Sequence, residues 1–309
     1  MDHVEPLPPS GLQAELVSGT QRAWVTEVGG GLRSYEMNGR SVVDGYGVLE
    51  MASGGQGQVL VPWPNRIGDG RYTFHGVEYQ LPLSEPGKHN ASHGLVRWSN
   101  WRLDQPGPAR VQASYLLHPQ PGYPFSLRIE IDYQLSETGL RVLVATTNVG
   151  DRAAPYGFGQ HPYLTVGTDL VDDARLQVPA GAVVPTDARG LPTGDVLSVS
   201  GTDLDFRLLR PIGPAVLDTC YTDLQRDANG VTSAVLADPT GHALTVWADH
   251  TVHYLMIFTG DTLAQARRRR SLAIEPMTCP PDAFRTGVGL LVLEPGQQQE
   301  TTWGITPNG

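Results

Sequence analysis

A short apolar run, Leu-Ala-Ile, ends on a carboxylate at Glu275. In an extended strand successive side chains alternate faces, so Leu272 and Ile274 point away from the face that carries Glu275. Ala273 shares that face but is too small to fill it, and Pro276 biases Glu275 toward an extended backbone. The pattern predicts room for a small ligand against the carboxylate. The alternative is an exposed glutamate at a strand end, because charged side chains are mostly at the surface.

His161 is the second group that could move a proton. It ends the run Tyr-Gly-Phe-Gly-Gln-His, in which glycine alternates with bulky residues from Tyr156 onward. Pro162 holds the histidine extended, and the glycines allow a ligand to approach the backbone closely. A functional histidine is the interpretation we favour over a surface histidine in a loop rich in glycine and proline.

A further histidine, His93, precedes Gly94 and is followed by Trp98 and Trp101. Gly94 gives the backbone freedom beside the imidazole, and tryptophan offers the flat apolar surface that packs on sugar faces. The alternative for His93 is a structural hydrogen-bonding role.

Asn65 and Arg66 lie in a loop stiffened by prolines, and a guanidinium can donate to the ring or hydroxyl oxygens of a sugar. The alternative for Arg66 is a loop-bracing arginine. Asp218 and Asp223 follow a hydrophobic strand, and one of them could accept hydrogen bonds from ligand hydroxyls. Exposed aspartates in turns are the more common outcome.

The composition limits the classes of partner. The chain has 309 residues and a formal net charge of -10, which argues against nucleic acid and an anionic membrane surface and favours a neutral small molecule. The basic run Arg267–Arg270 is therefore interpreted as a solvated connection. Cys220 and Cys279 are the only cysteines, which predicts a reduced, intracellular setting without disulfides or a cysteine zinc cluster. No phosphate-binding loop, dinucleotide fingerprint or metalloprotease motif is present, so we expect no cofactor and no metal.

Short strands must position these residues. The alternation of apolar and polar residues predicts strands over 16–26, 31–46, 111–117, 127–135, 140–149 and 252–258, hairpins over 71–81 and 234–248, and a closing pair, 289–294 with 300–305. One short helix is expected over Asp261–Arg270. The run Pro185–Asp205, rich in Gly, Thr and Asp, is interpreted as a long surface loop.

Many short strands with closely spaced turns indicate an all-β antiparallel sandwich. Candidate site residues fall on both sides of the 185–205 loop, so we expect a single domain over residues 1–309, with about 1–12 loosely ordered. The N-terminus lacks the pattern of a signal peptide, and no run is long enough to cross a bilayer. These features predict a soluble, cytoplasmic protein, as a monomer or homodimer.

The ordered set of motifs resembles the aldose 1-epimerase (mutarotase) family over roughly residues 21–303. The motifs are Asn65-Arg66, His93-Gly94, His161-Pro162-Tyr163, Asp218 and Glu275-Pro276. The resemblance implies a large antiparallel β-supersandwich of the galactose mutarotase-like type, with the sugar in a cleft across one sheet. Leu164 follows the His-Pro-Tyr triplet at a position where an aromatic residue is common in the family, and residues 277–285 differ from the best-known galactose-specific branch. Both departures bear on the preferred sugar.

The resemblance also implies roles. Glu275 is similar in position to the family's catalytic base, His161 to its catalytic acid and His93 to an assisting histidine. The expected sugar ligands are Arg66, Asn65, Asp218 and Tyr163.

The resulting hypothesis is an isomerase that interconverts the α and β anomers of a free hexose such as glucose or galactose by acid/base ring opening. Two alternatives keep the fold: a non-catalytic carbohydrate-binding or regulatory protein, and a hexose-6-phosphate 1-epimerase that uses Arg66 or the arginine run. A glycoside hydrolase would need a second carboxylate facing Glu275, and the candidate partner is a histidine.

Overall fold

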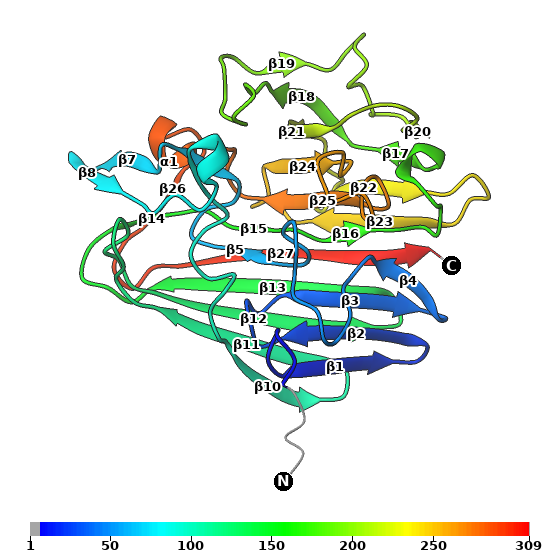
Figure 1. Cartoon of the computed structure of the whole chain (residues 1–309), viewed down its shortest axis with the longest axis horizontal. Coiled ribbons are helices and arrows are strands. Elements are labelled where there is room, and N and C mark those ends of the chain that lie inside the picture. Colours follow the sequence, from blue (N-terminus) through cyan, green and yellow to red (C-terminus); the bar gives the residue numbers. More distant parts are fainter. Residues whose placement is uncertain (1–6, 309) are drawn as a thin grey trace.

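Two large antiparallel sheets dominate the computed structural model, which describes residues 7–308 (Figure 1). The first sheet has 12 strands and contains, in spatial order, β1 (Gln13–Ser18), β2 (Gln21–Thr26), β3 (Leu32–Met37), β4 (Arg40–Val43), β16 (Tyr163–Leu164), β25 (Leu272–Met277), β24 (Tyr254–Phe258), β21 (Asp218–Leu224), β18 (Ala180–Val184) and β19 (Leu197–Ser198). β15 (Gly159–Gln160) joins β25 to β5 (Val59–Leu60) in the same sheet.

The second sheet has 9 strands. Its spatial order is β10 (Arg102–Gly107), β11 (Arg110–Leu117), β12 (Leu127–Ser136), β13 (Gly139–Asn148), β27 (Gln298–Asn308), β23 (Ala243–Ala248), β22 (Thr232–Ala237), β17 (Arg175–Gln177) and β20 (Arg210–Pro211). The all-β antiparallel prediction is confirmed.

Smaller elements complete the chain. The two-stranded pairs are β6 (Arg66–Gly68) with β9 (Asn90–Ser92), β7 (Arg71–Phe74) with β8 (Val77–Gln80), and β14 (Ala154–Tyr156) with β26 (Leu291–Leu293). The helical elements are the 3₁₀ turns η1 (Pro86–Lys88) and η2 (Val171–Asp173) and the short α1 (Ala283–Thr286). Within residues 7–308, no helix is long and apolar enough to cross a bilayer.

The core lies between the two sheets, where β1 and β2 pack on β11 and β12. β12 shows why: Ile129, Ile131 and Tyr133 are buried, while Arg128 and Glu130, on the other face, are exposed. β25 is different, because all its residues are buried. One face of β25 therefore packs in the core and the other must be covered by the chain above it.

Three expectations are corrected. The helix predicted over Asp261–Arg270 is wrong, because this segment forms turns and its arginines bind carboxylates of other segments. The prediction that Arg267–Arg270 is solvated is confirmed for the exposed Arg268 and is wrong for Arg267 and Arg269, which are partly buried and bound by other groups. Arg269 forms ion pairs with Asp172 and Asp261, both at 2.8 Å, and Arg270 pairs with Asp44 at 2.6 Å. Tertiary ion pairs override the local preference for a helix here.

The closing strand pair is also wrong. β26 pairs with β14, and β27 lies in the middle of the second sheet between β13 and β23. The 16–26 and 31–46 segments fold as hairpins, β1–β2 and β3–β4, and residues 185–205 contain only the two-residue strand β19. Of the N-terminal stretch expected to be loose, residues 1–6 lie outside the described residues.

Candidate active site

A cavity of about 480 Å³ covers the outer face of β25 and its neighbouring strands. Its floor is the sheet itself, and its walls are the loops that follow β4, β5, β8, β9 and β24. Six of the residues predicted from the sequence line it: Asn65, Arg66, His93, His161, Asp218 and Glu275. The first and the last of these residues, Asn65 and Glu275, are more than two hundred positions apart in the sequence, and the fold brings all six together.

Strand register places His161 opposite Glu275. Gly159 pairs with Met277 and Tyr163 with Ala273, so the intervening residues His161 and Glu275 face each other across the same two segments. Residues directly opposite on one face of an antiparallel pair bring their side chains together. His161 Nε2 lies 3.2 Å from Glu275 Oε1.

Pro276 fits this register because its missing N–H falls between β15 and β16, where no ladder bond is formed on that side. β25 continues through Pro276 to Met277 rather than stopping at it. Glu275 is 2% exposed, so the alternative of an exposed strand-end glutamate is wrong.

The face of β25 beside Glu275 was expected to leave room for a ligand next to Ala273, but aromatic rings fill this space. Ala273 is flanked by Tyr163 on β16 and Phe258 on β24, and the two rings lie 6.4 Å apart across it. Phe258 and Met256 line the cavity and Ala273 does not. The small alanine makes room for two aromatic rings, not directly for a ligand.

Burial shifts the pKa values of the two opposed groups in opposite directions. Desolvation raises the pKa of Glu275 well above its usual value, with the charge of Asp218 adding to the rise and Arg66 opposing it. Desolvation lowers the pKa of His161 to about 3. Burial therefore favours the neutral form of both groups, which places a proton shared by the pair on Glu275 rather than on His161. The arrangement can exchange that proton between a carboxyl and an imidazole.

The His161 ring packs against Tyr163 and Gly55. Tyr163 stacks on it, with ring centroids 4.8 Å apart and planes inclined by 26°. Gly55 approaches the ring so closely that an added Cβ would be 2.6 Å from His161 Cδ2. Tyr163 donates its hydroxyl hydrogen to Gly54 O at 2.7 Å, is buried, and is not among the cavity-lining residues.

The His93 tautomer follows from a backbone contact. His93 Nδ1 lies 3.2 Å from the Asn65 N–H, which donates to it, so the ring hydrogen is on Nε2. Burial lowers the pKa of His93 well below its usual value, with the neighbouring His161 adding to the effect. His93 is thus a neutral hydrogen-bond donor, and its ring centroid is 5.7 Å from that of His161.

Arg66 is both braced and exposed to the cavity. Glu85 accepts from Arg66 Nε at 2.8 Å and from Nη2 at 3.2 Å, a two-point contact that does not involve Nη1. Arg66 Nη1 donates one hydrogen to Asn65 Oδ1 at 3.5 Å, and its second hydrogen is left for another partner. The interpretation of Arg66 as a bracing residue is therefore confirmed, whereas its contact with a sugar stays a prediction. Glu85 was missed, because a lone glutamate before a proline carries no pattern that separates it from a surface residue.

The structure distinguishes the two candidate aspartates. Asp218 is exposed and lines the cavity beside Phe258, whereas Asp223 lies beside Gly181 and does not line it. It also distinguishes the tryptophans. Trp98 is 54% exposed at the cavity, and Trp101 is buried and donates to Val96 O.

Arg97 and Lys88 are two further cavity residues that the sequence did not single out. The Arg97 guanidinium lies 5.3 Å from the centroid of the Trp98 ring, and burial lowers the pKa of Arg97. Among the described residues it forms no ion pair.

Cys279 lies outside the cavity, and burial raises the pKa of its thiol to about 12. Residues 7–308 also contain no cluster of three or more His, Cys, Asp or Glu side chains able to hold a metal ion.

Comparisons with known proteins place the chain in a family. The sequence model of the aldose 1-epimerase family matches residues 14–306. The Escherichia coli protein YihR, described as uncharacterized, is 36% identical over 297 residues, which are 96% of this chain and 93% of YihR. The E. coli aldose 1-epimerase is 26% identical over 64% of this chain, and rat galactose mutarotase is 31% identical over 49%. The matched parts are 58% and 45% of those two relatives.

Solved structures share the fold. An aldose epimerase homologue from C. elegans superposes with a TM-score of 0.84 at 18% identity, covering 96% of this chain and 99% of the other. A galactose 1-epimerase from Lactobacillus acidophilus gives a TM-score of 0.78 at 20% identity, covering 94% and 92%. The family match over nearly the whole described chain and the shared supersandwich lead to one conclusion: the chain belongs to the aldose 1-epimerase family.

Proposed function

We propose that this protein is an aldose 1-epimerase that interconverts the α and β anomers of a free hexose such as glucose or galactose in the cytoplasm. The observation that carries the proposal is the 3.2 Å contact between His161 Nε2 and Glu275 Oε1 on the floor of a sugar-sized cavity. Membership of the family supports an isomerase reaction. The E. coli aldose 1-epimerase and rat galactose mutarotase are matched over only 58% and 45% of their length, so the identity of the sugar is part of what we propose.

The proton held by the pair suffices for the reaction. With this proton on His161, the Glu275 carboxylate removes the hydrogen from the C1 hydroxyl while His161 protonates the ring oxygen. The bond between C1 and the ring oxygen breaks, and C1 becomes an aldehyde. Glu275 is then protonated and His161 neutral, which is the form that burial favours. Rotation about C1–C2 and the reverse proton transfers close the ring as the other anomer.

Other cavity residues hold the sugar in this scheme. Arg66 Nη1, the arm that Glu85 leaves free, and the Nε2 hydrogen of His93 donate to sugar oxygens. Asp218 accepts from sugar hydroxyls, Asn65 contributes a polar edge, and the exposed Trp98 ring packs on a sugar face. Tyr163 positions His161 by stacking and does not contact the sugar.

Substituting Glu275→Gln tests the reaction. The amide keeps the size of the side chain but cannot take a proton, so we expect mutarotation of α-glucose or α-galactose, followed by polarimetry, to slow by about a hundredfold to ten-thousandfold. Circular dichroism and calorimetric sugar binding serve as controls for fold and affinity. A variant as fast as the wild type would sink the acid/base assignment, and wild-type binding without acceleration would identify a carbohydrate-binding protein.

A sugar 6-phosphate is the second candidate substrate, and Arg97 is the observation that favours it. Arg66 also lines the cavity, but Glu85 already neutralises its charge, and aspartates bind Arg269 and Arg270. Arg97 and Lys88 line the cavity without an ion pair among the described residues. If the substrate carries a phosphate, Arg97→Gln raises KM for glucose 6-phosphate much more than for glucose. Equal effects on both sugars would assign Arg97 to the free sugar.

A further inference from the structure

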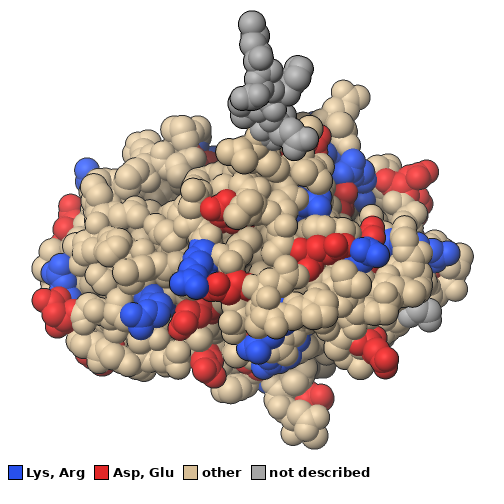
Figure 2. All heavy atoms as spheres, turned by 90° about the horizontal axis from the view of Figure 1, so that it is seen from below, with Lys and Arg blue, Asp and Glu red and all other residues tan. Residues whose placement is uncertain are grey.

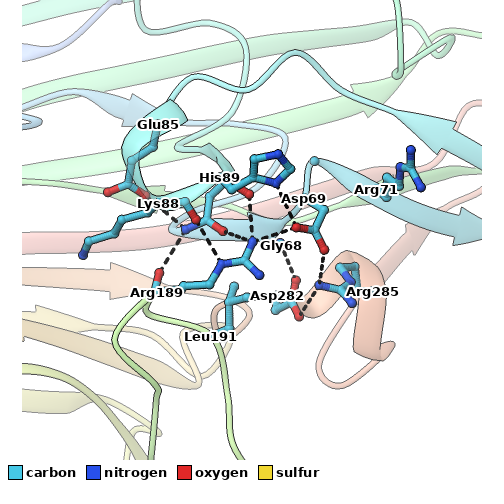
Figure 3. A network of polar contacts seen from close by, with 12 residues as sticks. Gly68, Asp69, Arg71, Glu85, Lys88, His89, Arg189, Leu191, Asp282 and Arg285 are labelled. Atoms are coloured by element: carbon cyan, nitrogen blue, oxygen red, sulfur yellow. Dashed lines mark hydrogen bonds and ion pairs between the residues drawn. The ribbon is translucent and has the colours of Figure 1, made fainter.

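The loop Asp187–Leu191, which we call the 187–191 loop, crosses from β18 to the small β6–β9 pair at the cavity wall (Figure 3). Asp187 Oδ1 accepts from the backbone N–H of Arg189 at 2.8 Å and of Leu191 at 3.0 Å, which closes the loop on itself. Leu191 is buried beside Gly68 of β6. The loop is thus a defined structure and not a loose connection.

Arg189 fastens this loop to the turn before β9. Its Nε donates to Lys88 O at 3.0 Å, and Nη2 donates to His89 O at 2.8 Å and to Asp69 Oδ1 at 2.9 Å (Figure 3). Asn90 adds a return contact, because its Nδ2 donates to Arg189 O at 2.9 Å. One arginine therefore binds two backbone carbonyls of this turn, the Asp69 carboxylate after β6 and, at 3.2 Å, Asn90 Oδ1.

The network formed by Arg189 and Asn90 extends to Arg66 through Glu85. Asn90 Nδ2 is also 3.2 Å from Glu85 Oε2, the oxygen that accepts from Arg66 Nε. Gly190, directly after Arg189, lies against the other edge of the guanidinium. A Cβ added there would be 2.5 Å from Arg66 Nη1 and 3.1 Å from Cζ. Arg66 is thus enclosed between Glu85 on one side and the Gly190 backbone on the other.

We infer that the 187–191 loop is a positioning device for Arg66, with Gly190 setting the place of Nη1 and Arg189 holding the loop in register. The inference rests on the proposed function, in which Nη1 binds the sugar. Glycine is required at position 190 for two reasons: its φ is +78°, and any side chain would take the space of the guanidinium arm that Glu85 leaves free.

Gly190→Ala and Gly201→Ala form a matched pair for the test. Both glycines have similar positive φ values, +78° and +75°, so alanine strains the backbone equally, but a Cβ at Gly201 would meet nothing within 4 Å. Only Gly190→Ala displaces Arg66. We expect Gly190→Ala to raise KM roughly tenfold or more with kcat almost unchanged, the pattern of a lost binding contact to a charged donor. Gly201→Ala should leave both constants unchanged.

Two further readouts separate positioning from general damage. In an Arg66→Ala background, Gly190→Ala should have no additional effect on KM, because the group that it displaces is absent. The Arg66 Nε–H resonance, identified by its loss in Arg66→Ala, should shift in Gly190→Ala and stay in place in Gly201→Ala. Arg189→Gln, at a partly exposed side chain, should give the same changes in weaker form and serves if the alanine variant does not fold.

The outcomes are distinct. Equal KM values for the two alanine variants, or an unchanged Arg66 resonance in Gly190→Ala, overturn the inference while leaving the epimerase proposal in place. A wild-type protein that accelerates no sugar overturns the proposed function, and the resonance then decides on its own whether the loop positions Arg66.

Discussion

Glu275 and His161 form a buried pair of ionisable groups whose pKa values are shifted in opposite directions. Glu275 is 2% and His161 5% exposed, and neither Glu275 Oε2 nor His161 Nδ1 has a hydrogen-bond partner among the described residues. Desolvation is therefore the main cause of both pKa shifts. Ionising either group without a ligand costs free energy, whereas moving one proton within the pair keeps its total charge.

The unfolding free energy should report this burial. The raised pKa of Glu275 gives stability that is complete below about pH 4.5 and is lost as pH rises toward the folded pKa. The lowered pKa of His161 gives stability that is complete above about pH 6.5 and is lost as pH falls toward 3. The two slopes oppose each other between 4.5 and 6.5, so only the loss from Glu275 remains above 6.5.

We therefore predict that wild type loses stability relative to Glu275→Gln between pH 6.5 and 8, by at most about 1.4 kcal/mol per pH unit. The amide has no proton to lose, so its own profile lacks this slope. Urea unfolding of both proteins at the two pH values measures the difference. Parallel profiles would mean that Glu275 is already ionised in the folded protein.

The two aspartates of β21 offer a comparison within one strand. Asp218 lines the cavity and Asp223 does not, so we predict that Asp218→Asn raises KM for the sugar by roughly tenfold, the loss of one charged hydrogen bond. Asp223→Asn is the control and should leave KM unchanged. Steady-state polarimetry on both variants decides between them, and a larger effect at Asp223 would reverse the assignment.

At the residue scale, the family resemblance supplied the cavity residues, whereas local pattern left each of them ambiguous. From the sequence, a surface position was plausible for both Glu275 and His161. Their burial and their contact between β25 and the facing segment exclude it. Glu85 and Arg97 were not predictable. Their roles depend on Arg66 and on the Trp98 ring, which the fold and not the sequence places beside them.

Among the elements, the segment Asp261–Arg270 shows how tertiary contacts decide local structure. Its composition permits a helix, but Arg267 Nη1 donates to Ser53 O at 3.2 Å and to Ser53 Oγ at 3.0 Å. The Arg267 guanidinium also lies 5.2 Å from the centroid of Tyr163, the ring that stacks on His161. Most of the groups that bind these arginines, among them Asp44, Ser53 and Asp172, are far away in sequence, so no local pattern could predict the turns.

We predict that Arg267→Met lowers the free energy of unfolding by about 1–3 kcal/mol, because it removes charged hydrogen bonds and a cation–π contact. Arg268→Met is the matched control: it makes the same chemical change at the adjacent exposed position, whose side chain forms no hydrogen bond or ion pair within residues 7–308. Urea unfolding compares the two. Equal stabilities would show that Arg267 does not hold the cavity wall at Ser53.

The register of β16 against β25 is an element-scale feature of the same kind. Alternation along the sequence predicts which face carries Glu275, but it contains no information on the strand that pairs with it. The partner comes from Gly159–Leu164, more than a hundred residues earlier. The gap between β15 and β16 lies opposite Pro276, which has no N–H to donate, and it contains His161. The same interruption of the ladder therefore accommodates the proline and places the histidine in the site.

For the whole molecule, the sequence predicted the class and the supersandwich, and both are confirmed. The strand order was not predictable, because β27 enters the second sheet between strands that are distant in sequence. On the face shown in Figure 2, acidic and basic side chains are interspersed over a mainly uncharged surface. The net charge of -10 is therefore not gathered into a single acidic field on this face.

The two sheets contribute differently to the cavity and to the core. The cavity floor belongs to the first sheet, whereas Ile131 lies on β12 of the second, is 1% exposed and packs in the core between the layers. Ile131→Ala leaves a cavity in that core and should lower the free energy of unfolding by about 2–5 kcal/mol. Glu130→Ala, on the exposed face of the same strand, should change it by less than about 0.5 kcal/mol.

Neither substitution touches a residue of the site, so KM and kcat per folded molecule should match the wild type in both variants. Unfolding in urea and polarimetry at a temperature where Ile131→Ala is still folded give the two quantities independently. A change in KM in Ile131→Ala would show that the second sheet also sets the geometry of the cavity, because the first sheet would then yield when the core beneath it loses a side chain.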